Sequence, residues 1–221
     1  MDAYNTVIRF FQEGGQFMYP IALVMVVGLV IALERWLFLS STGRANRKAA
    51  KIVQAGLATG DYQVLIKGAE KTKAPLLRVL ASGVSRLKDA HRREDVEYAM
   101  EESIMEVMLR LEKRTQYLAT LANIATLLGL LGTIIGLIAA FTAVANADPA
   151  EKANLLSQSI SVAMNTTAFG LMTAIPLSIF HAVLQTKTSE IVDSLEVAGI
   201  KLLNMLSYKS KTDPEAAGSR G

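Results

Sequence analysis

Three hydroxyl groups and one amide are the side chains best placed for chemistry, because they interrupt two long apolar blocks. Thr133 lies near the middle of the first block, and Asn165, Thr166 and Thr167 lie at a comparable depth in the second. A single threonine inside a membrane often bonds only its own helix backbone. Four such groups beside stripes of small residues can instead line a narrow polar path, so their spacing predicts an ion pathway.

The two blocks contain no ionisable side chain. They run from Leu118 to Val144 and from about Ala153 to Phe180. Transfer of protons or sodium through a dry bilayer usually requires a carboxylate as relay or ligand. An ion-conducting role therefore predicts a partner that brings a carboxylate to the threonines, and this chain would then supply half of a site.

Small residues recur at every fourth position beside the threonines. Such stripes let helix backbones approach closely within a membrane, and tight packing is the simplest role for any one of these glycines. Proline inside the second block is expected to kink its helix. The residues predicted to pack helices around the pathway are Gly129, Gly132, Gly136, Gly170, Ala174 and Pro176.

Residue patterns typical of catalysis are absent from the apolar blocks. The chain has no cysteine, no histidine cluster, and no serine paired with lysine or histidine inside an apolar block. His91 and His181 are interpreted as surface or interfacial residues. We predict no enzymatic activity, no cofactor, no resident metal and no nucleic-acid partner.

Composition indicates an integral membrane protein. Of the 221 residues, 51% are hydrophobic and only 19% are charged, and the apolar residues are concentrated in runs long enough to cross a bilayer. An additional span runs from about Phe17 to Leu39 and contains Glu34-Arg35-Trp36, which is interpreted as an anchor in the headgroup region. The predicted fold class is an all-α membrane protein with three transmembrane helices.

Lysine and arginine are distributed unevenly around these spans. The segment from Ser40 to Gln116 carries fifteen of them, and the residues after His181 carry five. In contrast, the stretch before the first span has only Arg9, and the connection between the second and third spans has only Lys152. The positive-inside rule then predicts a bacterial inner-membrane protein with a periplasmic N-terminus and a cytoplasmic C-terminus.

The predicted segments are an interfacial amphipathic stretch (1–16), three spans (17–39, 118–144 and 153–184), a cytoplasmic helical domain (40–117), a periplasmic turn (145–152), a cytoplasmic helical extension (185–208) and a disordered tail (209–221).

No glycine or proline interrupts Arg92 to Asn123, so a helix from about Glu94 is predicted to run unbroken into the second span. The third span is predicted to continue to about Tyr208. Spans two and three would then be the two long helices that extend into the cytoplasm.

Three segments resemble the MotA/TolQ/ExbB ion-channel family, in its ExbB/TolQ branch. Gly14-Gly15 through Ile21, followed by Glu34-Arg35, is similar to the first span of that branch. The run 128–136, followed by Phe141, resembles the second-span signature, and 167–171 followed by 174–176 resembles the third. The order and spacing agree over nearly the whole chain, up to about Tyr208.

The resemblance implies a mechanism as well as a fold. Family members form a pentameric ring around a dimer of a single-span ExbD/TolR-like partner, whose transmembrane aspartate faces two pore threonines. Those two threonines correspond to Thr133 and Thr167. The expected function is an ion-conducting stator or motor subunit, which converts the motive force of H⁺ or Na⁺ into mechanical work for transport or other envelope processes.

Two positions depart from the family pattern. Val162 stands where family members carry a glutamate, and Thr166 stands where alanine is usual. Losing an acid and gaining a hydroxyl favours a cation that binds neutral oxygens. A transient Na⁺ site at Thr133, Thr166 and Thr167 is therefore predicted as an alternative to proton coupling.

Two other functions remain open from the sequence. The chain could be a passive membrane scaffold whose threonines only pack helices. It could also be a flagellar stator subunit of the MotA type, although those proteins have four spans with the large cytoplasmic part between spans two and three.

Overall fold

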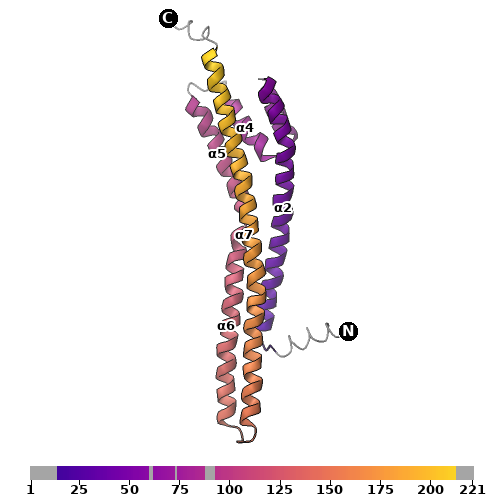
Figure 1. The fold of residues 1–221 in the computed structure, drawn as a ribbon, viewed down its shortest axis with the longest axis vertical. Helices are drawn as coiled ribbons and strands as arrows, with labels where there is room; N and C mark the ends of the chain where they lie inside the picture. The colour runs from indigo at the N-terminus through magenta and orange to yellow at the C-terminus, as the bar shows by residue number, and fades with distance from the viewer. Residues whose placement is uncertain (1–13, 60–61, 73, 88–92, 213–221) are drawn as a thin grey trace, which may run out of the picture. The chain divides into compact units, whose positions relative to one another are not determined.

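The computed structural model describes residues 14–59, 62–72, 74–87 and 93–212. The described residues form α-helices and no strands. These helices are α2 (Met18–Thr59), α3 (Gln63–Lys71), α4 (Pro75–Arg86), α5 (Arg93–Glu112), α6 (Thr115–Ala145) and α7 (Lys152–Thr212) (Figure 1). The predicted amphipathic stretch and the predicted disordered tail fall largely outside these residues, so both stay predictions.

Three helical segments are long and apolar enough to cross a membrane, which confirms the predicted number of spans. They are Met18–Gly56, Arg93–Ala145 and Lys152–Ser207. The most apolar 18-residue window of each is only 22%, 22% and 33% buried within the chain. Most of their apolar side chains therefore face outward, as lipid or a second protein surface requires.

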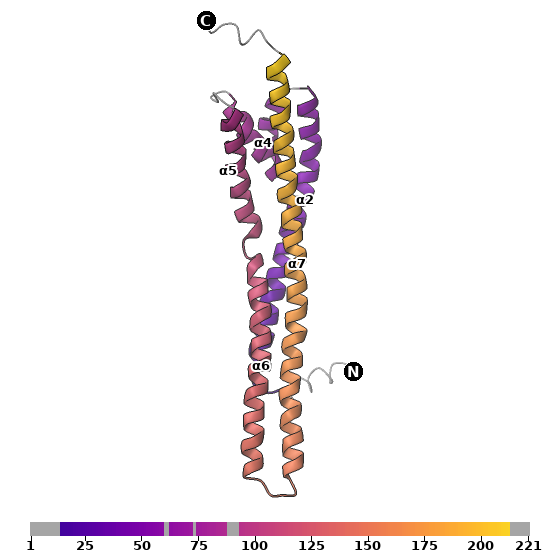
Figure 2. The ribbon, with the colours of Figure 1, turned by 60° about the vertical axis from the view of Figure 1, so that its left-hand side comes forward.

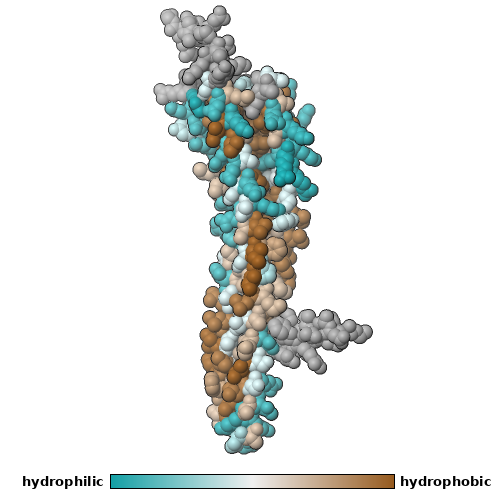
Figure 3. All heavy atoms as spheres, in the orientation of Figure 1, coloured by the Kyte–Doolittle hydropathy of each residue, from teal (hydrophilic) through white to brown (hydrophobic). Residues whose placement is uncertain are grey.

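The chain divides into two compact units. The membrane unit comprises Met1–Arg35 and Arg114–Val183, and the polar unit comprises Trp36–Lys113 and Leu184–Gly221. Hydrophobic side chains dominate the visible surface over α6 in the membrane unit, whereas hydrophilic ones dominate over the polar unit (Figure 3). The division separates the segments that would contact lipid from those that would contact water.

In the membrane unit, α6 and the first half of α7 lie side by side and run antiparallel, as two views show (Figures 1 and 2). The first part of α2 packs on them through Met18 and Ile21, which contact Phe169 in a small buried cluster. Further along α2, the backbone at Gly28 lies against the side chain of Leu177. This three-helix packing positions the polar residues of α6 and α7.

The polar unit is built from amphipathic helices. The buried face of α4 comprises Leu76, Leu77, Val79, Leu80, Gly83 and Val84, and that of α5 comprises Val96, Met100, Ser103, Val107 and Leu111. Both sets recur at the three- and four-residue spacing of a helix with one apolar face. Ser82 Oγ donates either to Val79 O of its own helix at 2.7 Å or to Ala99 O of α5 at 3.1 Å. Arg78 of α4 pairs with Glu106 of α5 at 3.0 Å, which joins the two helices.

The predicted unbroken helix from Glu94 into the second span is wrong. α5 ends at Glu112 and α6 starts at Thr115, because Arg114 adopts a left-handed conformation with φ of 67°. That conformation costs a residue with a Cβ about 1–2 kcal/mol. Here the Arg114 carbonyl accepts a hydrogen bond from Tyr117 N at 3.2 Å, and its guanidinium lies 3.5 Å from Glu34 Oε2.

The identity of the two long helices changes as a result. α2 continues for 42 residues through the first span to Thr59, and α7 continues for 61 residues through the third. α6 is limited to 31 residues by the break at Arg114. The helices that extend beyond their spans are therefore those of spans one and three, rather than two and three.

Candidate ion pathway

α6 and α7 approach each other closely at two glycines. A Cβ atom placed on Gly170 would lie 2.8 Å from Ala125 O and 3.0 Å from Gly129 Cα. A Cβ on Gly129 would lie 3.3 Å from Gly170 Cα and from Thr167 Cα. The two backbones are therefore in contact here, and a Cβ would collide with backbone at Gly170 and be tighter than ordinary packing at Gly129.

This backbone contact brings the hydroxyl groups of Thr133 and Thr167 together. The two Oγ1 atoms contact each other directly across the helix pair, and both side chains are only partly buried. Thr167 Oγ1 donates to Gly129 O at 3.0 Å. Thr133 Oγ1 lies 3.2 Å from the same carbonyl and 3.3 Å from Ala163 O.

The donors and acceptors around the two hydroxyls determine what the pair can bind. The two hydroxyls have one proton each, whereas the neighbouring oxygens offer acceptors at Gly129 O, Ala163 O and the opposite hydroxyl. Both protons are thus used within the chain, while lone pairs on the hydroxyl oxygens are left. The partly exposed pair can accept a hydrogen bond from a protonated carboxyl or supply neutral oxygens to a cation.

Thr166 has a different environment from Thr167. It is 2% exposed, and its hydroxyl donates to Gly14 O at 2.6 Å or to Val162 O at 3.0 Å. Its methyl group lies against Gly132, where a Cβ atom would collide with it. Thr166 therefore fastens the turn before α2 to α7 and is not part of the hydroxyl pair.

Asn165 is also separate from the pair. Successive residues of an α-helix are turned by about 100°, so Asn165 and Thr167 lie on opposite flanks of Thr166. Asn165 is partly exposed, and no hydrogen bond links it to either threonine of the pair in the part of the chain described. The four predicted pathway residues thus divide into one contacting pair and two residues with other surroundings.

The remaining predicted packing residues also differ in their surroundings. A Cβ on Gly136 would lie 2.9 Å from Ala163 Cβ, so this glycine too faces α7 closely. Ala174 is 6% exposed and belongs to the buried face of α7. Pro176 lies on an exposed face, and the helix is assigned without a break through it.

The sequence reasoning missed Thr173. Its side chain is 1% exposed, and its hydroxyl has no hydrogen-bond partner among the described residues. It follows Thr166 by seven residues, which is two helical turns, so both lie on the same face of α7. That spacing was visible in the sequence and could have indicated a shared buried face.

Charged groups gather where the membrane unit ends. Arg35 is 4% exposed, so its side chain packs within the chain, and the predicted position of Glu34-Arg35-Trp36 in the headgroup region stays a prediction. Glu34 instead makes the exposed contact, with Arg114. In the polar unit, Lys187 Nζ lies 3.3 Å above the Trp36 ring, a cation–π contact.

No group of three or more His, Cys, Asp or Glu side chains able to hold a metal occurs in the residues the structure describes.

Comparison with known proteins places these features in a family. A model of the MotA/TolQ/ExbB proton channel family matches residues 71–197. A protein from Methanothermobacter thermautotrophicus, named for homology to the biopolymer transport protein ExbB, is 29% identical over 197 residues, covering 88% of this chain and 68% of the relative. An ExbB-like protein from Synechocystis is 29% identical over 199 residues, covering 87% and 76%. Biopolymer transport protein exbB1 from Vibrio cholerae is 36% identical over 104 residues, covering 44% of each chain.

Proposed function

This chain belongs to the MotA/TolQ/ExbB proton channel family, and from that premise we propose that it is an ion-conducting motor subunit that energises transport across the cell envelope. The names of the relatives, which refer to biopolymer transport, support this proposal. The three membrane-spanning helices support it as well. The activity is conduction coupled to mechanical work and involves no covalent chemistry on a substrate.

The observation that carries the proposal is the contact between the Thr133 and Thr167 hydroxyls. It lies in two apolar blocks without an ionisable side chain. A hydroxyl pair conducts poorly alone, because it has no group that takes up and releases a proton near neutral pH. The pair suits a carboxyl group that moves past it and itself takes up and releases the proton, since the hydroxyl oxygens can accept a hydrogen bond from its protonated form.

The carboxylate has to come from a partner. We propose a single-span protein of the ExbD/TolR type, present as a dimer with a membrane aspartate, inside a ring of five copies of this chain. The many exposed apolar side chains on α6 and α7, such as Ile138, Phe141 and Met172, are consistent with burial against neighbouring copies and lipid. The proposed location is the bacterial inner membrane, with the N-terminus in the periplasm.

The position of Thr166 bears on the choice of ion. A sodium site that uses three threonines would need its hydroxyl, but that hydroxyl is bonded to Gly14 O and buried. Two hydroxyls remain, too few neutral oxygens for a sodium site of three threonines, which favours a proton carried by the partner carboxylate itself. Titrating transport with sodium at fixed pH tests this choice, and a rate that depends on sodium would overturn it.

The decisive experiment measures ion flux in proteoliposomes that contain the chain and its partner. Thr133→Val and Thr167→Val keep the side-chain volume but remove the hydroxyl, and each should reduce flux by at least about tenfold. Thr142→Val is the matched control, because its exposed hydroxyl bonds only Ile138 O of its own helix. The double variant should be little worse than either single one, because the two hydroxyls act as a unit.

The same variants distinguish the motor from a passive scaffold. A scaffold needs the threonines only for packing, so valine at either position would leave its function intact. The mass of the purified complex adds an independent criterion. Five copies with two copies of a partner support the motor, whereas a monomer or dimer that ignores the partner would leave the hydroxyl pair without a carboxylate.

A further inference from the structure

A cavity of about 410 Å³ lies in the polar unit, outside the proposed ion pathway. It is open to solvent on one side and is bounded by the part of α2 that follows Trp36, by the start of α4 and by residues 190–201 of α7. Its apolar wall includes Ala50, Val53, Leu76, Ile191, Val197 and Ala198. A volume of this size with an apolar wall and a few polar groups is typical of a small-molecule site.

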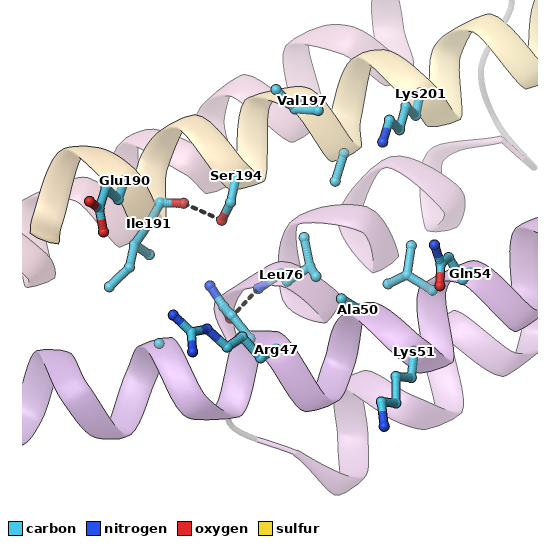
Figure 4. Close-up of a pocket in the computed structure, with 14 residues that line it drawn as sticks. Arg47, Ala50, Lys51, Gln54, Leu76, Glu190, Ile191, Ser194, Val197 and Lys201 are labelled. Carbon is cyan, nitrogen blue, oxygen red and sulfur yellow. Dashed lines mark hydrogen bonds between the residues drawn. The ribbon is translucent and has the colours of Figure 1, made fainter.

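The polar groups around the cavity are predominantly cationic. Arg47 and Lys51 line it from α2, and Lys201 lines it from α7. Glu190 is the one carboxylate among the lining residues. Figure 4 shows Glu190 across from Arg47 at one end, and Lys201 across from Gln54 at the other. Three cations against one anion make the cavity favourable for a negatively charged ligand.

The surrounding sequence strengthens this charge. Between Trp36 and Thr59, α2 carries Arg44, Arg47, Lys48 and Lys51 and no aspartate or glutamate. α4 also begins at the cavity, since its second residue, Leu76, is part of the wall. The N-terminus of a helix carries a partial positive charge, which adds to the attraction for an anion.

Asn46 is the feature that points to a ligand rather than to charge alone. It lines the cavity, is 6% exposed, and uses Oδ1 to accept a hydrogen bond from Leu76 N at 3.2 Å. That bond orients the amide so that Nδ2 is left as a donor, and Nδ2 has no partner among the described residues. A buried donor without an acceptor is unfavourable, and a ligand oxygen in the cavity would satisfy it.

We propose that this cavity binds an anion that carries a phosphate group. Arg47 matches a phosphate through its planar pair of N–H donors, and the two lysines add point charges. The volume exceeds that of a bare phosphate, and the apolar wall suits an attached organic group. The phosphate could belong to a soluble organic phosphate or to the headgroup of an anionic lipid, and the experiment separates these two sources.

The first arm uses the full chain in neutral detergent, titrated with inorganic phosphate and with adenosine 5′-monophosphate at constant ionic strength. Calorimetry should show saturable binding to the wild type. Arg47→Gln and Lys201→Gln should each weaken binding by about tenfold, the usual loss for one charge-assisted hydrogen bond. Lys48→Gln is the matched control, because it removes the same charge from the same helix but does not line the cavity.

Asn46→Asp tests the amide directly. Aspartate retains an oxygen that can accept from Leu76 N, so the hydrogen bond to the start of α4 is kept, but the Nδ2 donor is replaced by a negatively charged oxygen. Binding should be abolished while the helical circular dichroism is unchanged. If this variant does not fold, Arg47→Gln and Lys201→Gln still decide the question.

The second arm uses nanodiscs of phosphatidylcholine with and without phosphatidylglycerol. Retention of phosphatidylglycerol that depends on Arg47 and Lys201, without binding of the soluble probes, would assign the phosphate to a lipid. Absence of binding in both arms would overturn the proposal, as would equal losses in Lys48→Gln and Lys201→Gln. A complex that dissociates in Arg47→Gln and Lys201→Gln and binds no anion would instead assign the cavity to a second copy of the chain.

Discussion

The Thr166 hydroxyl donates a hydrogen bond of 2.6 Å to the carbonyl oxygen of Gly14, which lies 152 residues earlier in the chain. The bond joins α7 to the turn before α2, while the neighbouring Thr167 contacts Thr133 on α6. Two adjacent threonines therefore have different tasks. Thr166 holds the first span in place, and Thr167 completes the hydroxyl pair.

Replacing Thr166 by valine should lower stability without abolishing ion flux per folded complex. The change leaves Gly14 O without this donor in a buried place, which costs about 1–3 kcal/mol. Thermal unfolding in detergent measures the loss, and Thr166→Ser should recover most of it. Flux that falls as far in Thr166→Val as in Thr167→Val, at unchanged stability, would contradict this division of tasks.

Thr173→Val should have the opposite effect on stability. The Thr173 hydroxyl is buried and unpartnered within the described residues. Replacing it by a methyl group of similar size removes a desolvation cost of about 1 kcal/mol. The unfolding temperature of the purified chain should rise, and a fall would contradict the conclusion that burying this hydroxyl is unfavourable.

Gly170→Ala should separate α6 from α7. The added Cβ would meet Ala125 O and Gly129 Cα, both of which are backbone atoms that cannot rotate away. We expect a loss of about 1–3 kcal/mol from overpacking, measured by unfolding in a denaturing detergent, together with reduced flux.

Gly43→Ala is the control for that substitution. Gly43 is also inside a helix, but nothing lies within 4 Å of an added Cβ. Alanine there should be neutral or should stabilise by about 0.5–1 kcal/mol through helix propensity. Equal losses at the two glycines would show that close packing is not the reason for Gly170.

Arg114, which precedes α6, has a left-handed conformation, so substitutions there should differ in how much they destabilise the chain. Arg114→Gly and Arg114→Ala both remove the contact with Glu34, but only glycine adopts a φ of 67° without strain. The glycine variant should therefore be the more stable of the two by about 1 kcal/mol. An alanine variant of equal or greater stability, measured by thermal unfolding, would argue that α5 and α6 can join into one straight helix.

The sequence was sufficient for the number of spans, because runs of apolar residues without charge have few alternatives to a membrane helix. It also indicated Thr133 and Thr167, since hydroxyls are conspicuous in such runs. The glycines at 129 and 170 were identified by spacing alone, because small residues at every fourth position align on one helix face.

Other features were decided by tertiary structure. The sequence could not separate Thr166 from Thr167, because which face of α7 meets α6 and which meets the turn before α2 depends on three helices packing together. It could not locate the break at Arg114 either, since no glycine or proline marks it. Local sequence determines which residues are apolar and how often they recur, whereas the direction of each polar side chain depends on contacts between segments far apart in the chain.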